Sequence, residues 1–178
     1  MRIELDCGRW RPATDADLAA IVAIADKIHL AYPEDAATIA ERLRLYPAGC
    51  ALFEREGMPL AYTLTHPWHY ADPPALNATL GALPDSPTTY YIHDVALLPE
   101  ARGTGAAAAI VQAIVEHAET TGSRDLSLVA VNNSVSFWTR FGFKVTDEPG
   151  LRAKLLTYDV DARFMVRRLL AERQDQPR

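Results

Sequence analysis

The chain has 178 residues, 49% hydrophobic and 23% charged, which suits one well-buried α/β core and excludes a disordered or collagen-like chain. Its net charge of −5 and pI near 5.5 argue against a broad nucleic-acid-binding surface and mildly favour an amine-bearing partner. No apolar run reaches the length of a membrane span, and residues 1–10 lack the apolar core of a signal peptide, so we expect a cytoplasmic protein without a membrane partner.

The first half of the chain predicts two helices followed by a hairpin. Capping side chains at 14–17 precede an apolar face at helical spacing that runs from Leu18 to Ile28, which predicts that the first helix begins there. A second helix fits Pro33–Tyr46. Gly49–Glu54 and Met58–Thr65 have the pattern of antiparallel strands joined by a tight turn.

The segment Pro67–Thr89 interrupts this regular pattern with five prolines. It predicts a long loop, with at most a turn of helix at Ala75–Leu83. Long loops inside compact domains often cover a substrate.

The second half of the chain alternates strands with helices. The predicted elements are the strand Tyr90–Leu97, the helix Gly103–Thr121, the strand Asp125–Val131, the helix Ser134–Phe141, the strand Phe143–Thr146, a loop or short helix over Pro149–Asp159 and the strand Ala162–Leu169. We therefore expect one α/β domain over residues 1–170, with a mixed, partly antiparallel central sheet flanked by helices, and a frayed tail at 171–178.

The junction between the strand ending at Leu97 and the alanine-rich helix is the most informative segment. Its residues are Arg102, Gly103, Thr104, Gly105, Ala106 and Ala107. The glycines let the backbone approach an anion, the first free amides of the helix point toward it, and the arginine adds positive charge. This turn therefore predicts a phosphate-binding site.

Two motifs resemble the GNAT superfamily of acyl-CoA-dependent N-acyltransferases. Residues 102–107 fit that family's pattern Arg/Gln-x-x-Gly-x-Gly/Ala, and residues 133–143, one helix and one strand later, resemble its Asn…Ala/Ser-x-x-Phe-Tyr-x-x-x-Gly-Phe signature. The resemblance spans about Arg9 to Leu169. It implies a GNAT-like domain with splayed strands, acetyl-CoA as co-substrate, and direct transfer of the acetyl group to a primary amine of a small molecule or peptide in a ternary complex. Family members often dimerise, so a homodimer is also expected.

A dinucleotide site is the strongest rival interpretation, because Gly103–Ala108 also satisfies Gly-x-Gly-x-x-Gly/Ala. A dinucleotide fold requires an acidic residue at the end of the next strand, where this chain has Val129 to Asn133. The context therefore favours acyl-CoA.

The resemblance also implies the residues that contact the cofactor. Backbone groups of Val95, Ala96 and Leu97 would bind the acyl carbonyl and the pantetheine arm between the splayed strands, and the amides of residues 102–107 would bind the pyrophosphate. Asn133 matches a position that reaches the cofactor, although an asparagine after a strand is also a turn residue.

Trp138 occupies the place where most members have a tyrosine that protonates the departing thiolate. Indole is too weak an acid for that step, so Tyr91 or Tyr158 would supply the proton, or the thiolate would leave unassisted.

The catalytic base is expected on the strand Tyr90–Leu97, beside the thioester. Alternation places Tyr91, His93 and Val95 on one face of that strand, and Ile92, Asp94 and Ala96 on the other. His93 is the first candidate, because imidazoles accept protons near neutral pH, and its alternative role is to anchor the strand. Asp94 would orient His93, bind the amine, or cap the buried helix side.

Other features are weaker. Glu34 and Asp35 would attract an ammonium group or simply begin a helix, and Trp68, His69 and Tyr70 could line an acceptor pocket. His66 and His69 lack the companions of a metal site, and Cys7 and Cys50 are isolated, so no metal is expected. The alternative function is a non-catalytic acyl-CoA-binding or sensing module, which Trp138 suggests.

Overall fold

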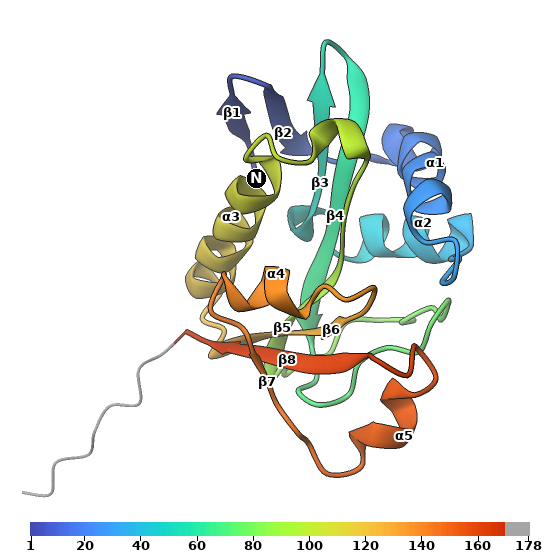
Figure 1. Cartoon of the computed structure of the whole chain (residues 1–178), viewed down its shortest axis with the longest axis vertical. Helices are drawn as coiled ribbons and strands as arrows, with labels where there is room; N and C mark the ends of the chain where they lie inside the picture. The colour runs from blue at the N-terminus through green and yellow to red at the C-terminus, as the bar shows by residue number, and fades with distance from the viewer. Residues whose placement is uncertain (170–178) are drawn as a thin grey trace, which may run out of the picture.

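The computed structural model describes residues 1–169. Over these residues a mixed eight-stranded sheet has helices on both faces (Figure 1). In chain order the strands are β1 (Ile3–Leu5), β2 (Gly8–Pro12), β3 (Cys50–Arg55), β4 (Met58–Trp68), β5 (Thr89–Leu97), β6 (Asp125–Ala130), β7 (Lys144–Val145) and β8 (Arg163–Arg168). The helices are α1 (Leu18–Ile28), α2 (Ala36–Leu45), α3 (Ala106–Thr120), α4 (Val135–Thr139) and α5 (Leu151–Leu155), with single 3-10 turns at Asp15–Asp17, Pro47–Gly49 and Pro99–Ala101.

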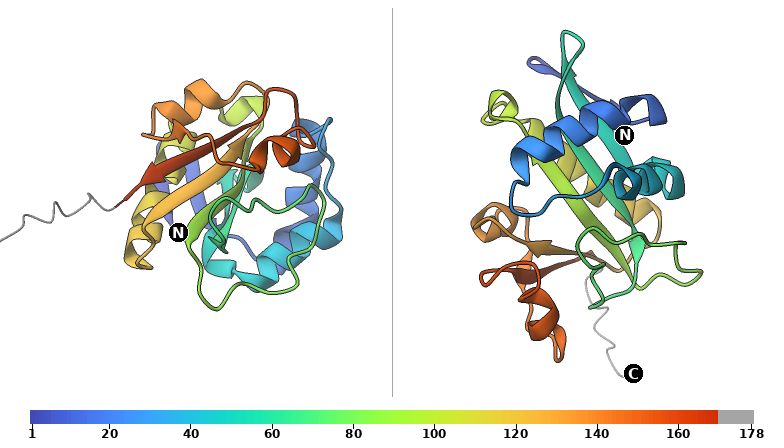
Figure 2. Two further views of the ribbon diagram at one scale, coloured as in Figure 1. Left: turned by 90° about the horizontal axis from the view of Figure 1, so that it is seen from below. Right: turned by 90° about the vertical axis from the view of Figure 1, so that its right-hand side faces the viewer.

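The strand order is β1-β2-β3-β4-β5-β6-β8-β7. All neighbours are antiparallel except β5 and β6, which run parallel and are joined through α3. Helices α1 and α2 cover one face of the sheet and α3 covers the other (Figures 1 and 2). The expected fold class is therefore confirmed.

The start of α3 is fixed by a contact from the N-terminal strand β2. Trp10 of β2 is fully buried, and its indole Nε1 donates a hydrogen bond to the carbonyl oxygen of Ala106 at 2.9 Å. Below this contact, α3 buries Ile110, Val111 and Ile114 against the sheet. Burying a large apolar side chain contributes about 1.5 to 3 kcal/mol, so the helix that opens at the glycine turn rests on a rigid core.

Strands β5 and β6 separate soon after they pair. Their register contains only Tyr90 opposite Leu126 and Tyr91 opposite Ser127, after which β5 continues to Leu97 beside β4 alone. The backbone of residues 92–97 thus has a free hydrogen-bonding edge toward β6. This is the splayed arrangement that the resemblance implied.

A β-bulge changes the direction of side chains in the middle of β5. The β4–β5 register passes from Leu64 opposite Asp94 to Thr65 opposite Ile92, so His93 is an extra residue in its strand. The expectation that His93 and Asp94 point to opposite faces is wrong, because both side chains reach partners at the end of α1 and in the connection to α2.

Other differences from the sequence predictions are local. The sequence pattern does not predict strands β1 and β2. No helix forms at Ala75–Leu83, where the β4–β5 connection is a loop that hydrogen-bonds to α2. Strand β4 continues to Trp68, because Pro67 can lie in a strand where its missing amide is not needed. The predicted domain end at 170 and the tail at 171–178 lie outside the described residues.

Candidate functional site

A cavity of about 780 Å³ occupies the gap between the splayed strands. Its walls come from β5, the glycine turn before α3, the β6–α4 connection, the end of α1 with the connection to α2, and the loop at 74–76. One continuous space therefore joins the predicted phosphate-binding turn to the predicted catalytic strand.

The glycine turn forms one end of the cavity. Gly103 and Gly105 have φ values of 73° and 85°, in the left-handed region that glycine adopts without strain, and a Cβ at either position would meet nothing within 4 Å. Arg102 lines the cavity and donates from Nε to the carbonyl oxygen of Leu97 at 3.3 Å. Gly103, Gly105 and Ala107 also line it, whereas Thr104 and Ala106 do not.

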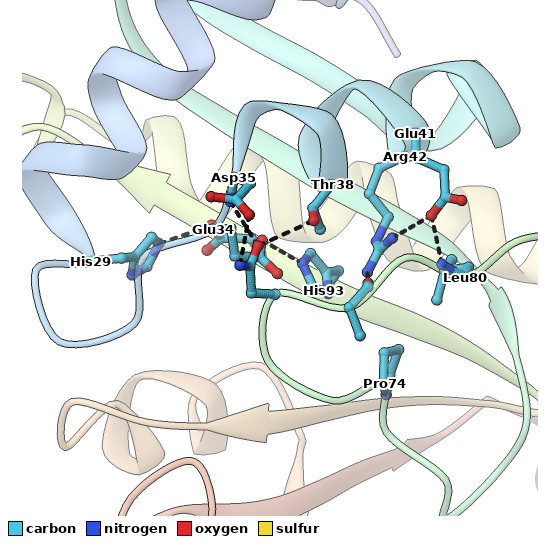
Figure 3. A network of polar contacts seen from close by, with 12 residues as sticks. His29, Glu34, Asp35, Thr38, Glu41, Arg42, Pro74, Leu80 and His93 are labelled. Atoms are coloured by element: carbon cyan, nitrogen blue, oxygen red, sulfur yellow. Dashed lines mark hydrogen bonds and ion pairs between the residues drawn. The ribbon is translucent and has the colours of Figure 1, made fainter.

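His93 and Glu34 form the first polar pair at the other end. His93 Nε2 lies 2.9 Å from Glu34 Oε2, and both side chains are largely buried, at 12% and 14% exposure. Burial raises the pKa of Glu34, but the nearby His93 and Arg42 lower it more, so the pKa is below its usual range and the carboxylate stays charged. Its second oxygen, Oε1, is buried without a hydrogen-bond partner among the described residues. Figure 3 shows Glu34 and His93 pointing toward one another.

His29 and Asp94 form the second pair. His29, at the C-terminal cap of α1, lies with Nε2 2.8 Å from Asp94 Oδ2, and the Tyr62 hydroxyl donates to the same carboxylate oxygen. Burial lowers the pKa of His29, but the Asp94 carboxylate outweighs it and raises the pKa above the usual value. Asp94 therefore orients His29 and not His93, which corrects one of the roles expected for it.

Aromatic and imidazole side chains lie beside these pairs. Tyr91 is 3% exposed, and burial raises the pKa of its phenol well above the usual value. The ring of His66 lies 6.3 Å from that of His93. Burial, and secondarily the charge of His93, lowers the pKa of His66 to about 3, which keeps it neutral. Tyr158 lines the cavity, and its hydroxyl group donates a hydrogen bond to the carbonyl oxygen of Pro74.

The second sequence motif is placed on the opposite wall. Trp138 lines the cavity at 7% exposure and packs edge-to-face on Phe143. Asn132 lines the cavity, whereas Asn133 lies in a separate surface depression. Both asparagines have positive φ, which supports the turn role for Asn133.

The long loop contributes to the cavity at a different place than expected. Pro74, Ala75 and Leu76 line it, whereas residues 68–70 do not. Trp68 instead donates from Nε1 to the carbonyl oxygen of Asp72 at 2.7 Å, so the aromatic residues 68–70 are not part of this cavity. Asp35 also lies outside the cavity; its backbone amide donates to Asn77 Oδ1 at 2.7 Å.

Sequence reasoning missed His29 and Tyr62 as site residues. The only available signals were a histidine directly after the apolar face of α1 and a tyrosine in the strand next to β5.

Within residues 1–169 no group of three or more His, Cys, Asp or Glu side chains could hold a metal ion. In the same part of the chain, no helix is long and apolar enough to cross a membrane.

Comparison with known proteins agrees with this geometry. Residues 19–143 match the sequence model of the acetyltransferase (GNAT) family. The chain belongs to this family. No curated protein matches the sequence significantly.

Solved structures show that this GNAT chain shares its fold with distant relatives. The GphF GNAT-like decarboxylase in complex with isobutyryl-CoA superimposes with a TM-score of 0.75 at 15% identity, covering 91% of this chain and 100% of that one. Ard1 from Thermoplasma volcanium gives 0.70 at 17% identity, covering 93% and 99%. N-acetylglutamate synthase from Neisseria gonorrhoeae, complexed with coenzyme A and L-arginine, gives 0.65 at 18% identity, covering 94% of this chain and 34% of that one.

Proposed function

We propose that this GNAT protein transfers the acetyl group of acetyl-CoA to a primary amine by direct attack in a ternary complex. The observation that carries the proposal is that one cavity connects the glycine turn to two histidine–carboxylate pairs. Such a space accommodates a nucleotide-linked thioester at one end and an amine at the other.

The glycine turn and β5 would hold the acyl donor. Free amides from the turn to the first residues of α3 provide hydrogen bonds to the pyrophosphate, with the helix dipole and Arg102 adding positive potential. The free edge of Val95, Ala96 and Leu97 faces the separating strand β6. An acyl carbonyl bound there would lie beside His93.

His93 would accept the proton of the attacking amine. Glu34 accepts a hydrogen bond from the protonated Nε2, which leaves Nδ1 as the ring nitrogen with a free lone pair. The ammonium form of the acceptor first gives one proton to Nδ1 of His93, which leaves a neutral amine with a free lone pair. The amine nitrogen then bonds to the thioester carbon, the carbon–sulfur bond breaks, CoA leaves as the thiolate, and the second proton of the nitrogen is released to water.

Trp138 sets this chain apart from the family pattern, because its indole cannot protonate the thiolate. The Tyr158 phenol is bound to Pro74 and burial of both Tyr91 and Tyr158 raises their pKa values, so neither is a strong acid. A thiolate is a fair leaving group near neutral pH, so we propose that it departs unassisted. The same departure motivates the alternative, a non-catalytic acyl-CoA-binding or sensing module.

Calorimetric titration followed by assay of CoA release with a panel of amines tests the proposal. Saturable acetyl-CoA binding with amine-dependent release of CoA supports the transferase. Binding without release by any amine favours the sensing module, and binding of NADH in its place favours the dinucleotide interpretation. Homodimerisation and a cytoplasmic location stay predictions.

A further inference from the structure

The end of the cavity farthest from the glycine turn, here called the acceptor end, has an unusual balance of charge. Its titratable lining residues are Glu34 and Asp94, their partners His93 and His29, and several tyrosines. Among the described residues at this end, no lysine or arginine lines the cavity. The two arginines that line the cavity, Arg102 and Arg140, belong to the glycine turn and the end of α4.

The nearest buried cation is already engaged. Arg42 does not line the cavity, and its side chain is 1% exposed. Its Nη1 lies 3.0 Å from Glu41 Oε2, and its Nη2 donates to the carbonyl oxygen of Ala78 at 2.8 Å. The lysine beyond the loop, Lys154, pairs with Asp72 at 2.7 Å. Arg42 Nε is buried without a partner among the described residues, but Arg42 does not line the cavity and Lys154 is paired, so neither cation contacts a ligand inside the cavity.

Glu34 makes the acceptor end favourable for a cation. Its carboxylate is charged, as its lowered pKa requires, and the residue lines the cavity wall. A negative charge at the wall of a largely enclosed site favours a ligand that carries an ammonium group. A ligand carboxylate in the same place would meet Glu34 and Asp94, whose histidine partners, His93 and His29, are already engaged with them.

The loop that covers the acceptor end is held on both sides. On the α2 side, Asn77 accepts from the amide of Asp35 at 2.7 Å, and Glu41 accepts from the amide of Gly81 at 3.0 Å. On the α5 side, Tyr158 donates to the carbonyl oxygen of Pro74. Figure 3 shows the loop of Pro74 passing beside the row formed by His29, Glu34, His93 and Arg42. A bulky peptide would have to displace this loop.

We propose that the acceptor is a small amine that carries no carboxylate, in preference to an amino acid or a protein terminus. This inference rests on the proposed acetyl transfer. The ammonium group of the acceptor would face Glu34, and the tyrosine side chains of the cavity would surround its carbon skeleton. Among residues 1–169, no lysine or arginine at this end would bind a carboxylate of the acceptor.

Matched pairs of acceptors test the proposal, each pair differing only in one carboxylate. Tyramine against tyrosine, histamine against histidine and agmatine against arginine are compared by kcat/KM for acetylation, with a tripeptide as a further acceptor. We expect the carboxylate-free member of each productive pair to be favoured by at least ~100-fold, because an unpaired buried carboxylate is heavily penalised. Equal or better acetylation of the amino acids or the tripeptide would overturn the inference while leaving acetyl transfer intact. No amide product from any acceptor would overturn it together with the proposed activity.

A charge introduced at the loop provides a second test. Leu76 lines the cavity and is 37% exposed, so Leu76→Arg places a cation at the acceptor end without emptying the core. The variant is expected to reduce the preference for tyramine over tyrosine by at least ~10-fold, since it supplies the missing counter-ion. Leu30→Arg is the matched control, because Leu30 is 84% exposed and outside the cavity. An unchanged preference in a Leu76→Arg protein with unchanged melting temperature would overturn the charge argument.

Discussion

Glu34 accepts a hydrogen bond from His93 at 2.9 Å, joining a residue of the α1–α2 connection to the bulged residue of β5. The pair predicts that Glu34 is a positioning residue for the proposed base. Glu34→Gln keeps the shape but removes the charge that stabilises the imidazolium. We expect kcat to fall roughly 10- to 100-fold with KM for acetyl-CoA unchanged.

The acetyl-CoA affinity of the Glu34→Gln protein should stay unchanged, because the glycine turn is at the other end of the cavity. Glu119→Gln, an exposed change at the end of α3, serves as the control. A kcat of Glu34→Gln within twofold of the parent value, or an equal loss in kcat and in acetyl-CoA affinity, would contradict the positioning role.

His93→Gln tests the base itself. The amide can fill the space but cannot take up a proton, so kcat should fall by about 100-fold or more, and the acidic limb of the pH profile should disappear. Titration of acetyl-CoA should give the parent dissociation constant. If the acidic limb persists with its midpoint unchanged, another group is the base, and His29 is the next candidate.

Trp138→Tyr tests whether proton donation to the thiolate limits the rate. The phenol would restore the acid that the family pattern has at this place. Because the thiolate leaves without assistance in our account, kcat should stay within roughly threefold of the parent value. A tenfold rise would show that a missing acid had limited turnover.

The ion pair of Asp17 with Arg11, which lies outside the cavity, predicts that the stability of the fold decreases in acid. Hydrogen bonds from Arg11 lower the pKa of Asp17 to about 2, so the folded state holds the charged carboxylate more strongly than the unfolded chain does. This contribution, about 2 kcal/mol, is fully present above pH 5 and is lost as the pH falls toward 2.

Asp17→Asn should therefore lower the free energy of unfolding by roughly that amount at pH 7 and flatten its decline in acid. Urea unfolding at pH values between 7 and 2.5 measures both effects. Asp15→Asn, an exposed change in the same 3-10 turn, is the control. Parallel pH dependences for Asp17→Asn and the parent would contradict the assignment.

The sequence predicted the elements that carry strong local signals. The glycines at 103 and 105 need positive φ, and the hairpin and the helices between 18 and 139 follow apolar periodicity, so these were found. The bulge at His93 could not be found, because it depends on how β4 and β5 pair across 28 residues, counted from Thr65 to His93. Glu34 and His29 contact His93 and Asp94 of β5 across 59 and 65 residues of sequence, so only the folded structure brings them together. The two N-terminal strands are too short to show a periodic pattern.

Binding of acetyl-CoA at the glycine turn is the central claim, and calorimetric titration of three proteins tests it most directly. Gly105→Glu and Gly122→Glu both place a side chain at positive φ, 85° and 76°, where a Cβ meets nothing within 4 Å, so they share the same backbone strain and added charge. Only Gly105 lines the cavity. The account predicts saturable acetyl-CoA binding to the parent and to Gly122→Glu, and loss of binding in Gly105→Glu. Equal binding to all three proteins, or no binding to the parent, would contradict it.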